Sequence, residues 1–307
     1  MSRDRSAWTT YGATSLFVLL WSSGAIFARL GLDHASAFAF LVMRFAIALA
    51  ILSILALSRR PRQVPAPGSR LRVAVAGSLM LGTYSICYLL ALDHGVTPGV
   101  LATVLGAQPL VTLVATERRF SPARVIGLGL ALVGLVLVVY HSVVVARLSA
   151  PGVAFALGAL AGMTLGAILQ KSVTQSPLAV LPLQYGASLI LCLAFVPFEP
   201  FRFEPVTGFV IPLLWLAIVI SVAAQLVLYR LIRVGNLVNV TSLFYLVPIV
   251  TTVMDRWFLG NPVSLMSGCG MAAILAGLAM VFRTGGPGSR TRTRGGGDRR
   301  STPWRRP

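Results

Sequence analysis

The chain alternates between long apolar runs and short polar connections. Each run has about 20 residues, the length that an α-helix needs to cross a hydrocarbon core roughly 30 Å thick. The runs cover residues 11–31, 36–57, 71–91, 96–116 and 123–143, then 151–170, 178–198, 209–229, 236–258 and 263–282. Because a spanning segment must satisfy its own backbone hydrogen bonds in lipid, we expect all ten to be helices.

The second five runs repeat the first five. Gly127 and Gly134 correspond to Gly270 and Gly277 at one constant offset, and other matches follow in the same order in both halves. An odd number of spans in each half obliges the second copy to enter the membrane with the opposite orientation, a geometry typical of transporters. The sequence therefore predicts an all-α integral membrane protein, with ten transmembrane helices arranged as two inverted five-helix repeats.

The expected domains follow from this duplication. Residues 11–143 form the first repeat, with helices 1 to 5, and residues 151–283 form the second, with helices 6 to 10. Residues 284–307 are too rich in Gly, Pro and Arg to bury a core, so we expect a disordered, basic, cytoplasmic tail.

The composition agrees with a chain dissolved in lipid. Apolar residues make up 56% of it and charged residues 11%, and the mean hydropathy is +0.84. A net charge of +18 would favour nucleic acid binding by a soluble protein. Here the positive residues lie mainly in the connections and the tail, so topology explains them, and the expected partner is the bilayer rather than nucleic acid.

The distribution of these positive residues predicts the orientation, because positively charged short loops stay in the cytoplasm. Alternate connections carry eleven of them: Arg59, Arg60, Arg62, Arg70, Arg72, Arg118, Arg119, Arg124, Lys171, Arg230 and Arg233. The opposite set carries four: Arg29, Arg147, Arg202 and Arg256. We therefore expect both termini in the cytoplasm. The strong preference for Arg over Lys indicates a GC-rich genome, and hence a bacterial inner membrane.

Residue types that carry catalysis are sparse. Cys87, Cys192 and Cys269 lie inside apolar runs, far apart and without metal-ligand spacing. The chain shows no Ser/His/Asp order, no paired-carboxylate site and no phosphate-binding glycine loop. We therefore expect neither an enzyme nor a bound cofactor or metal.

Small residues recur every four positions in two of the runs. They are Ala154, Gly158, Gly162 and Gly166 in the sixth, and Ser264, Gly268, Ala272 and Ala276 in the tenth. Such stripes let helices approach closely in lipid. They predict packing faces, either within the chain or between the two copies of a homodimer.

Several motifs together resemble one family. They are Leu20-Trp21-Ser22-Ser23-Gly24-Ala25-Ile26, then Met43-Arg44-Phe45, then Thr241-Ser242-Leu243-Phe244-Tyr245-Leu246-Val247-Pro248 followed by Leu259-Gly260. In this order, and duplicated, they resemble the EamA-like permeases of the drug/metabolite transporter superfamily over residues 12–283. The resemblance implies a ten-helix permease that exports or exchanges small metabolites. The chain departs from the family at Asn261, where a glutamate is common.

A binding site is expected where helices are interrupted at matching positions in the two halves, since freed backbone groups are tolerated beside a cavity. Pro109 and Pro248 fit this description, and Gln108 and Tyr245 lie close to them in sequence. The alternative is that the prolines only bend helices for packing. Four residues are missing after Pro109 relative to Pro248, which predicts a fourth span about one turn shorter than the ninth or a tighter turn after it.

Arg44 is the only basic residue well inside a run. A central Arg costs about 2.5 to 3.5 kcal/mol on insertion scales unless it is paired or hydrated. It either binds helix carbonyls, extends to the outer surface near Asp33, or awaits an anionic group of the substrate. Its counterpart in the second repeat is Gln184.

Further polar and aromatic residues complete the candidate site. Trp21, Tyr84, Tyr88 and Gln225 lie in otherwise apolar helices. We expect some of them to face a central cavity, although aromatic residues near helix ends also form interfacial belts.

The candidates for ion coupling lie near the outer ends of the spans. Asp255 is the first of them, followed by Asp93 and His94. Proton antiport, exchange and facilitated diffusion all stay open. The sequence thus favours a secondary transporter for a small metabolite, amino-acid-like compound or drug, working by alternating access and most simply in export; a membrane-embedded enzyme and a non-transporting scaffold are the alternatives.

Overall fold

The computed structural model describes residues 2–59, 64–118, 121–140, 144, 149–259 and 264–284, without the side chains of 2–11, 25, 255–259 and 284. Within these ranges every regular element is a helix, apart from one bridge between Ala35 and Phe203. Nine helical segments there are long and apolar enough to cross a membrane, and a tenth, α7 (Pro122–Val138), has 17 residues. The prediction of ten membrane helices is confirmed. The tail beyond residue 284 lies outside the described ranges.

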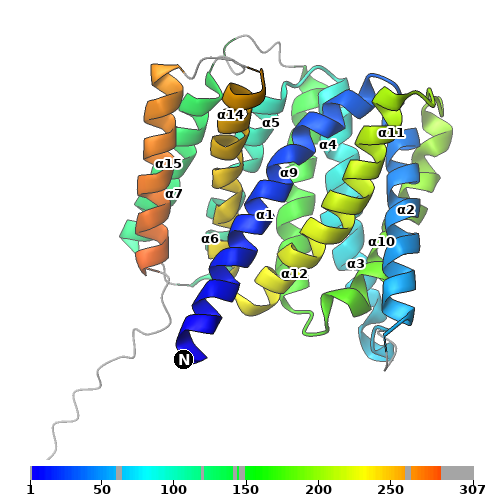
Figure 1. Ribbon diagram of the computed structural model, residues 1–307, viewed down its shortest axis with the longest axis horizontal. Helices are drawn as coiled ribbons and strands as arrows, with labels where there is room; N and C mark the ends of the chain where they lie inside the picture. The colour runs from blue at the N-terminus through cyan, green and yellow to red at the C-terminus, as the bar shows by residue number, and fades with distance from the viewer. Residues whose placement is uncertain are drawn as a thin grey trace, which may run out of the picture.

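The two halves share the same irregularities in their third and fourth spans, and Figure 1 shows how their helices are arranged. The first half comprises α1 (Ser2–Leu32), α2 (Ala37–Leu57), η1 (Pro67–Ser69), α3 (Arg70–Gly77), η2 (Ser78–Thr83), α4 (Tyr84–Asp93), α5 (Pro98–Leu105), α6 (Gln108–Thr116) and α7. The second comprises α9 (Ala150–Lys171), α10 (Pro177–Phe195), η3 (Val196–Phe198), α11 (Thr207–Leu214), η4 (Trp215–Ala224), α12 (Gln225–Val234), α13 (Leu237–Ser242), η5 (Leu243–Tyr245), α14 (Leu246–Leu259) and α15 (Leu265–Thr284). The third and eighth spans each contain a π-helical segment, η2 and η4. The fourth and ninth are each broken near a proline.

The broken spans differ in length as the sequence spacing indicates. After the break, α6 has 9 residues and α14 has 14. The four residues missing from the first copy therefore shorten its second helical piece by about one turn.

The last spans of the two halves, α7 and α15, pack side by side through glycines (Figure 1). A Cβ atom on Gly127 would lie 2.7 Å from the carbonyl oxygen of Gly277, and one on Gly134 would lie 2.6 Å from that of Gly270. Gly127 is the sequence equivalent of Gly270, and Gly134 is that of Gly277. Each glycine thus packs against the equivalent of the other, the pairing expected around a two-fold axis that relates inverted repeats.

The two small-residue stripes behave differently. Gly158, Gly162 and Gly166 pack inside the chain, and a Cβ on Gly166 would lie 2.5 Å from the backbone nitrogen of Met80. The stripe on α15 faces outward instead, because a Cβ on Gly268 would meet nothing within 4 Å. α15 packs against α7 through Gly270 and Gly277 and not through this stripe. Contact between two copies of the chain therefore stays the prediction for the stripe.

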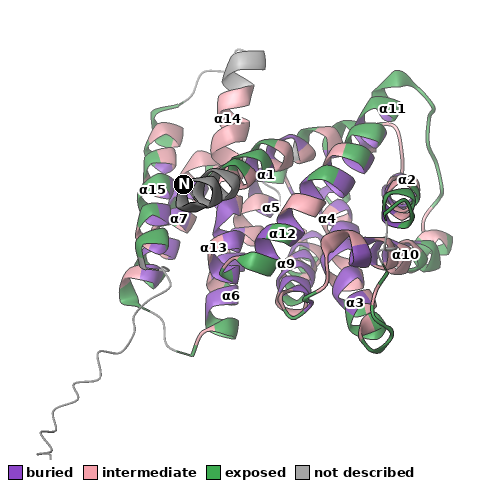
Figure 2. Cartoon of the chain, turned by 60° about the horizontal axis from the view of Figure 1, so that its bottom comes forward, coloured by how far each residue is buried: buried purple, intermediate pink, exposed green. Residues whose placement is uncertain are grey.

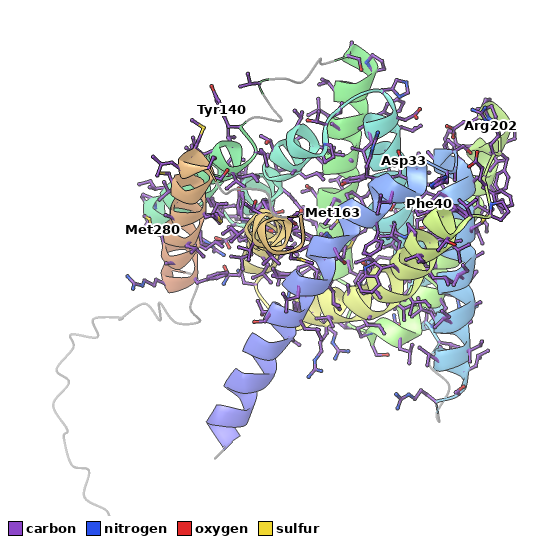
Figure 3. All side chains as sticks on the ribbon, turned by 45° about the horizontal axis from the view of Figure 1, so that its top comes forward. Asp33, Phe40, Tyr140, Met163, Arg202 and Met280 are labelled. Atoms are coloured by element: carbon purple, nitrogen blue, oxygen red, sulfur yellow. The ribbon has the colours of Figure 1, made fainter. Side chains whose placement is uncertain are left out.

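Buried residues gather on the inward faces of the helices (Figure 2). One apolar cluster joins α1, α2, α4, α9, α10 and the η4–α12 span, and a smaller one joins α6, α7, α13, η5 and α15. Large apolar side chains such as Leu71, Ile190 and Leu265 are exposed, as expected where lipid covers the bundle. Met163, labelled near the centre of Figure 3, belongs to the larger cluster and lines the cavity of the candidate site.

Candidate functional site

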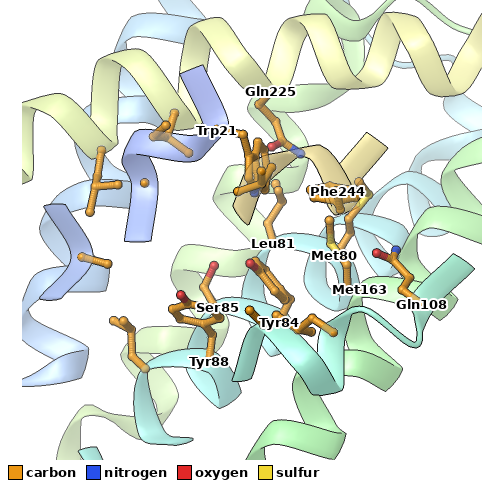
Figure 4. A pocket seen from close by; sticks show the side chains of 18 of the residues that line it. Trp21, Met80, Leu81, Tyr84, Ser85, Tyr88, Gln108, Met163, Gln225 and Phe244 are labelled. Atoms are coloured by element: carbon orange, nitrogen blue, oxygen red, sulfur yellow. The ribbon is translucent and has the colours of Figure 1, made fainter. Parts of the chain in front are cut away.

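A cavity of about 170 Å³ lies between the two halves of the bundle (Figure 4). Helices from both repeats form its wall, including the π-helical segments η2 and η4 and the broken spans α5–α6 and η5–α14. Seven of the ten residues predicted for the site line it: Trp21, Arg44, Tyr84, Tyr88, Gln108, Gln225 and Pro248. The irregular segments of the backbone thus coincide with the cavity, as expected in lipid.

Aromatic rings form much of this wall. The rings of Trp21 and Phe244 meet edge to face with centroids 5.3 Å apart. Those of Phe45 and Tyr185 do the same at 5.5 Å. Neither Phe45, Tyr185 nor Phe244 was among the predicted site residues. A signal was available, because Phe45 and Tyr185 directly follow Arg44 and its counterpart in the repeat.

Arg44 crosses from the first repeat to the second. Its Nε donates a hydrogen bond of 2.8 Å to the Ser221 hydroxyl, which η4 contributes. The Ser221 carbonyl accepts a second bond, 2.8 Å long, from the Tyr185 hydroxyl. Extension of Arg44 towards Asp33 is wrong as a prediction, since Asp33 pairs with Arg29 at 3.7 Å and Arg44 stays in the cavity wall.

Gln108 is the first residue of α6 and faces the cavity (Figure 4). The residue is only 2% exposed, and its side-chain Nε2 has no hydrogen-bond partner within the described residues. A buried amide donor without a partner costs on the order of 1–3 kcal/mol. An arriving ligand with an acceptor group would remove that cost.

Tyr245 and Pro109 lie outside the cavity wall, although the sequence placed both in the site. The Tyr245 hydroxyl donates a hydrogen bond of 2.5 Å to the carbonyl of Gly106, at the junction of α5 and α6. The second repeat thus satisfies a backbone group at the break in the first. Tyr245 therefore stabilises the break between α5 and α6 and does not form part of the cavity wall.

Gln184 also lies outside the wall, because it is used for packing between α3, α9 and α10. Its Nε2 donates to the Gln170 side-chain oxygen at 2.7 Å and to the Val73 carbonyl at 3.1 Å. A Cβ on Gly77 would lie 2.3 Å from the Cβ of Gln184, so the helices meet very closely here. Gln184 has therefore diverged in role from its repeat counterpart, Arg44.

Two of the three coupling candidates, Asp93 and His94, do not line the cavity. Asp93 and His94 are exposed at the end of α4, where the His94 ring lies 5.1 Å from that of Phe155. The side chain of Asp255 lies outside the described residues. Among the described residues, no group of His, Cys, Asp and Glu has the arrangement of a metal site.

A polar group around the buried Arg124 joins the two repeats at one end of the bundle, and we call it the Arg124 cluster: Glu117, Arg124, Asn236 and Asn239. Arg124 pairs with the Glu117 carboxylate and donates to the side-chain oxygens of Asn236 at 2.7 Å and Asn239 at 2.8 Å. The Asn236 amide also donates to Glu117, at 3.3 Å. Nearby, Lys171 donates to three carbonyls at the end of α12.

Two loops join the repeats at the opposite end, and we call them the His34 loops, 33–36 and 199–206. The backbone nitrogen of Ser36 donates to the Arg202 carbonyl at 2.9 Å, and that of Glu204 donates to the His34 carbonyl at 2.9 Å. The His34 ring lies 3.4 Å from the Glu204 carboxylate. Asp33 and Arg202 mark these loops in Figure 3.

The cavity is displaced towards the His34 loops. Its wall reaches Ala28, near the end of α1, and Pro98, the first residue of α5. Both positions lie on the side of the His34 loops, whereas none of the Arg124 cluster lines the cavity. The wall of the cavity therefore does not reach the Arg124 cluster at the other end of the bundle.

A duplicated helical bundle around a polar and aromatic cavity is the architecture of a membrane transporter. The family model for the EamA-like transporter family matches residues 9–140 and 150–283. The chain therefore belongs to the EamA-like transporter family, with two EamA domains, and this family consists generally of transporters rather than enzymes.

Solved structures share this fold, and 29 chains match it. One of them, described only as the crystal structure of a protein, superposes with a TM-score of 0.71 at 20% identity, covering 89% of this chain and 96% of its own. No curated protein matches the sequence.

Proposed function

We propose that this transporter moves a small organic solute through the cavity by alternating access, in the direction of export. The observation that carries the proposal is the composition of the cavity wall, in which both repeats contribute and Arg44 and Gln108 present polar groups among aromatic rings. The resemblance of the motifs to permeases that export or exchange metabolites favours export. A metabolite, an amino-acid-like compound or a drug of one ring fits this space.

The two ends of the bundle support an alternating mechanism. The Arg124 cluster and the His34 loops each join the first repeat to the second through hydrogen bonds. Rocking of one repeat against the other would break one set of contacts while the other set forms, so that the cavity opens to each side in turn. The conformation described here would be the one closed at the Arg124 cluster.

We further propose a topology and a division of the chain. Both termini lie in the cytoplasm of a bacterium, which places the Arg124 cluster on the cytoplasmic side and the His34 loops outside. The excess of Arg and Lys in alternate connections supports this orientation. The repeats would span 11–143 and 151–283, with a basic tail over 284–307.

A thiol at Ser85 tests the mechanism without knowledge of the substrate. Ser85 lines the cavity (Figure 4), and Ser85→Cys would be made after replacing the three native cysteines. We expect a membrane-impermeant thiol reagent to label it in right-side-out and in inverted vesicles. A variant that keeps only Cys192, which is fully buried, serves as the unlabelled control. Labelling of Ser85→Cys from one side only would contradict alternating access.

A further inference from the structure

We propose that the cavity takes a single-ring organic anion, whose carboxylate or sulfonate group binds Arg44 while its ring packs against the aromatic wall. The inference rests on the proposed function, since it names the class of solute carried through the same site. It comes from three features of the cavity: the unused hydrogen-bond donors of Arg44, the unpartnered amide of Gln108, and the size of the space.

Arg44 brings a positive charge that lies 5.9 Å from the centre of the Phe45 ring and that no ion pair in the described part of the chain neutralises. Its guanidinium makes one hydrogen bond within the described residues, from Nε to Ser221, and this bond is to a neutral hydroxyl. Both Nη groups remain for a ligand, and their planar arrangement matches the two oxygens of a carboxylate. No acidic side chain stands among the described residues that line the cavity. An anionic ligand would neutralise Arg44 in a region of low dielectric, whereas a cation would be repelled there.

Gln108 supplies a second, independent indication of a ligand. Its unpartnered Nε2 is a donor, buried and in the cavity wall. The hydroxyls of Tyr84, Ser85 and Tyr88 also line the space (Figure 4). Because the polar groups on the wall are rich in donors, they suit a ligand that is rich in acceptors.

The volume of the cavity suits a ligand of about one ring. An engineered apolar cavity of about 150 Å³ admits benzene, and the cavity here measures about 170 Å³. The rings of Trp21, Phe244, Phe45 and Tyr185 give it faces and edges for aromatic contact. A benzene ring with one anionic group therefore fits both the size and the chemistry of the site.

The test compares two permanently charged probes of similar size in proteoliposomes of the purified full-length protein. Benzenesulfonate carries the negative charge and trimethylanilinium the positive one, so neither leaks as a neutral form. We expect saturable flux of benzenesulfonate, about tenfold or more above that of trimethylanilinium, because a charge-assisted pair is typically worth at least one factor of ten in affinity.

Variants then assign the preference to Arg44. Arg44→Gln should lower benzenesulfonate flux by about tenfold or more, Arg44→Lys should keep part of it, and Arg230→Gln, on an exposed arginine of α12, should leave it unchanged. Labelling of Ser85→Cys in the Arg44→Gln background shows that this variant still folds and opens. Gln108→Leu should lower flux with Arg44 intact.

Two results would overturn the inference: flux of trimethylanilinium equal to or above that of benzenesulfonate, or full benzenesulfonate flux in Arg44→Gln. Failure of both probes to move would also overturn it. Two-sided labelling of Ser85→Cys in the same preparation would then leave the transport mechanism standing, whereas one-sided labelling would remove both proposals together.

Discussion

Removal of Arg124 should destabilise the protein through the contact between its two repeats. Arg124 is 5% exposed, and it holds Glu117 from its own repeat together with Asn236 and Asn239 from the other. Arg124→Met keeps much of the apolar length and deletes the charge. The Asn239 amide oxygen then loses its donor, while the Glu117 carboxylate keeps the Asn236 amide and the Asn236 oxygen keeps the Asn239 backbone nitrogen.

The magnitude follows from burial. Breaking a buried ion pair from one side costs about 3–5 kcal/mol. The Glu117 side chain is 21% exposed and regains some hydration, so we expect a loss of about 2–3 kcal/mol for Arg124→Met. Glu117→Gln should cost only about 1–2 kcal/mol, because Arg124 keeps its bonds to Asn236 and Asn239. The double variant should fall short of the sum by about 1–2 kcal/mol.

The assay is the free energy of reversible unfolding in mixed detergent micelles, measured for the wild type, the two single variants and the double variant. Arg118→Met, on an exposed arginine nearby, is the matched control and should change stability by less than about 0.5 kcal/mol. Additive losses, with no coupling between positions 117 and 124 beyond about 0.5 kcal/mol, would refute the reasoning that Glu117 and Arg124 stabilise the protein as a pair.

Four further predictions follow. Gly277→Ala should destabilise the protein by about 1–3 kcal/mol, because its Cβ would lie 2.4 Å from a carbonyl oxygen of α7. Gly268→Ala, in open space, should stabilise it by up to about 1 kcal/mol. Equal effects of the two variants in an unfolding titration would argue against the glycine contact. Tyr245→Phe should cost about 1–3 kcal/mol, since a buried carbonyl at the α5–α6 break loses its donor, and Tyr140→Phe, on an exposed tyrosine, should cost nothing measurable in the same titration. Burial raises the pKa of Glu199 above its ordinary value of 4.5, so the folded chain binds this proton more tightly than the unfolded chain and loses stability as the pH rises above that value. Glu199→Gln should therefore raise the melting temperature at pH 7 and lose this advantage below pH ~4. A higher melting temperature of the variant at the lower pH would contradict the argument. If the solute is an anion, an inside-negative potential should speed its efflux from vesicles, because the potential adds a driving force of about 2.3 kcal/mol per 100 mV for each elementary charge. Slower efflux under that potential would exclude an anion as the species carried.

The sequence was most informative where lipid imposes a strict rule. The length of the apolar runs predicted the transmembrane helices, because the bilayer sets the length of a helix that crosses it. Repeated glycines at one offset predicted the duplication, and Gly127 and Gly277 now show the physical reason, since only glycine permits the contact between α7 and α15. Paired prolines predicted the breaks at α5–α6 and near η5.

The sequence was less informative about which side of a helix faces the cavity. Helices in lipid are apolar on both their inner and outer faces, so the hydrophobic period that orients a helix in a soluble protein is weak. Arg44 and Gln184 hold equivalent positions, yet only Arg44 lines the cavity. The π-helical segments η2 and η4 carry no residue signature that would have revealed them. Ser221, the partner of Arg44, was missed for that reason.

The most direct test of alternating access combines a reversible lock with the thiol at position 85. The Glu117 and Asn236 side chains lie 3.3 Å apart across the two repeats, so a short cleavable cross-link between Glu117→Cys and Asn236→Cys would hold the Arg124 cluster closed. Ser85→Cys, blocked during cross-linking and then released, should react in inverted vesicles only after the lock is cleaved, and in right-side-out vesicles with the lock intact. Equal reactivity in inverted vesicles with the lock fully formed would contradict the account.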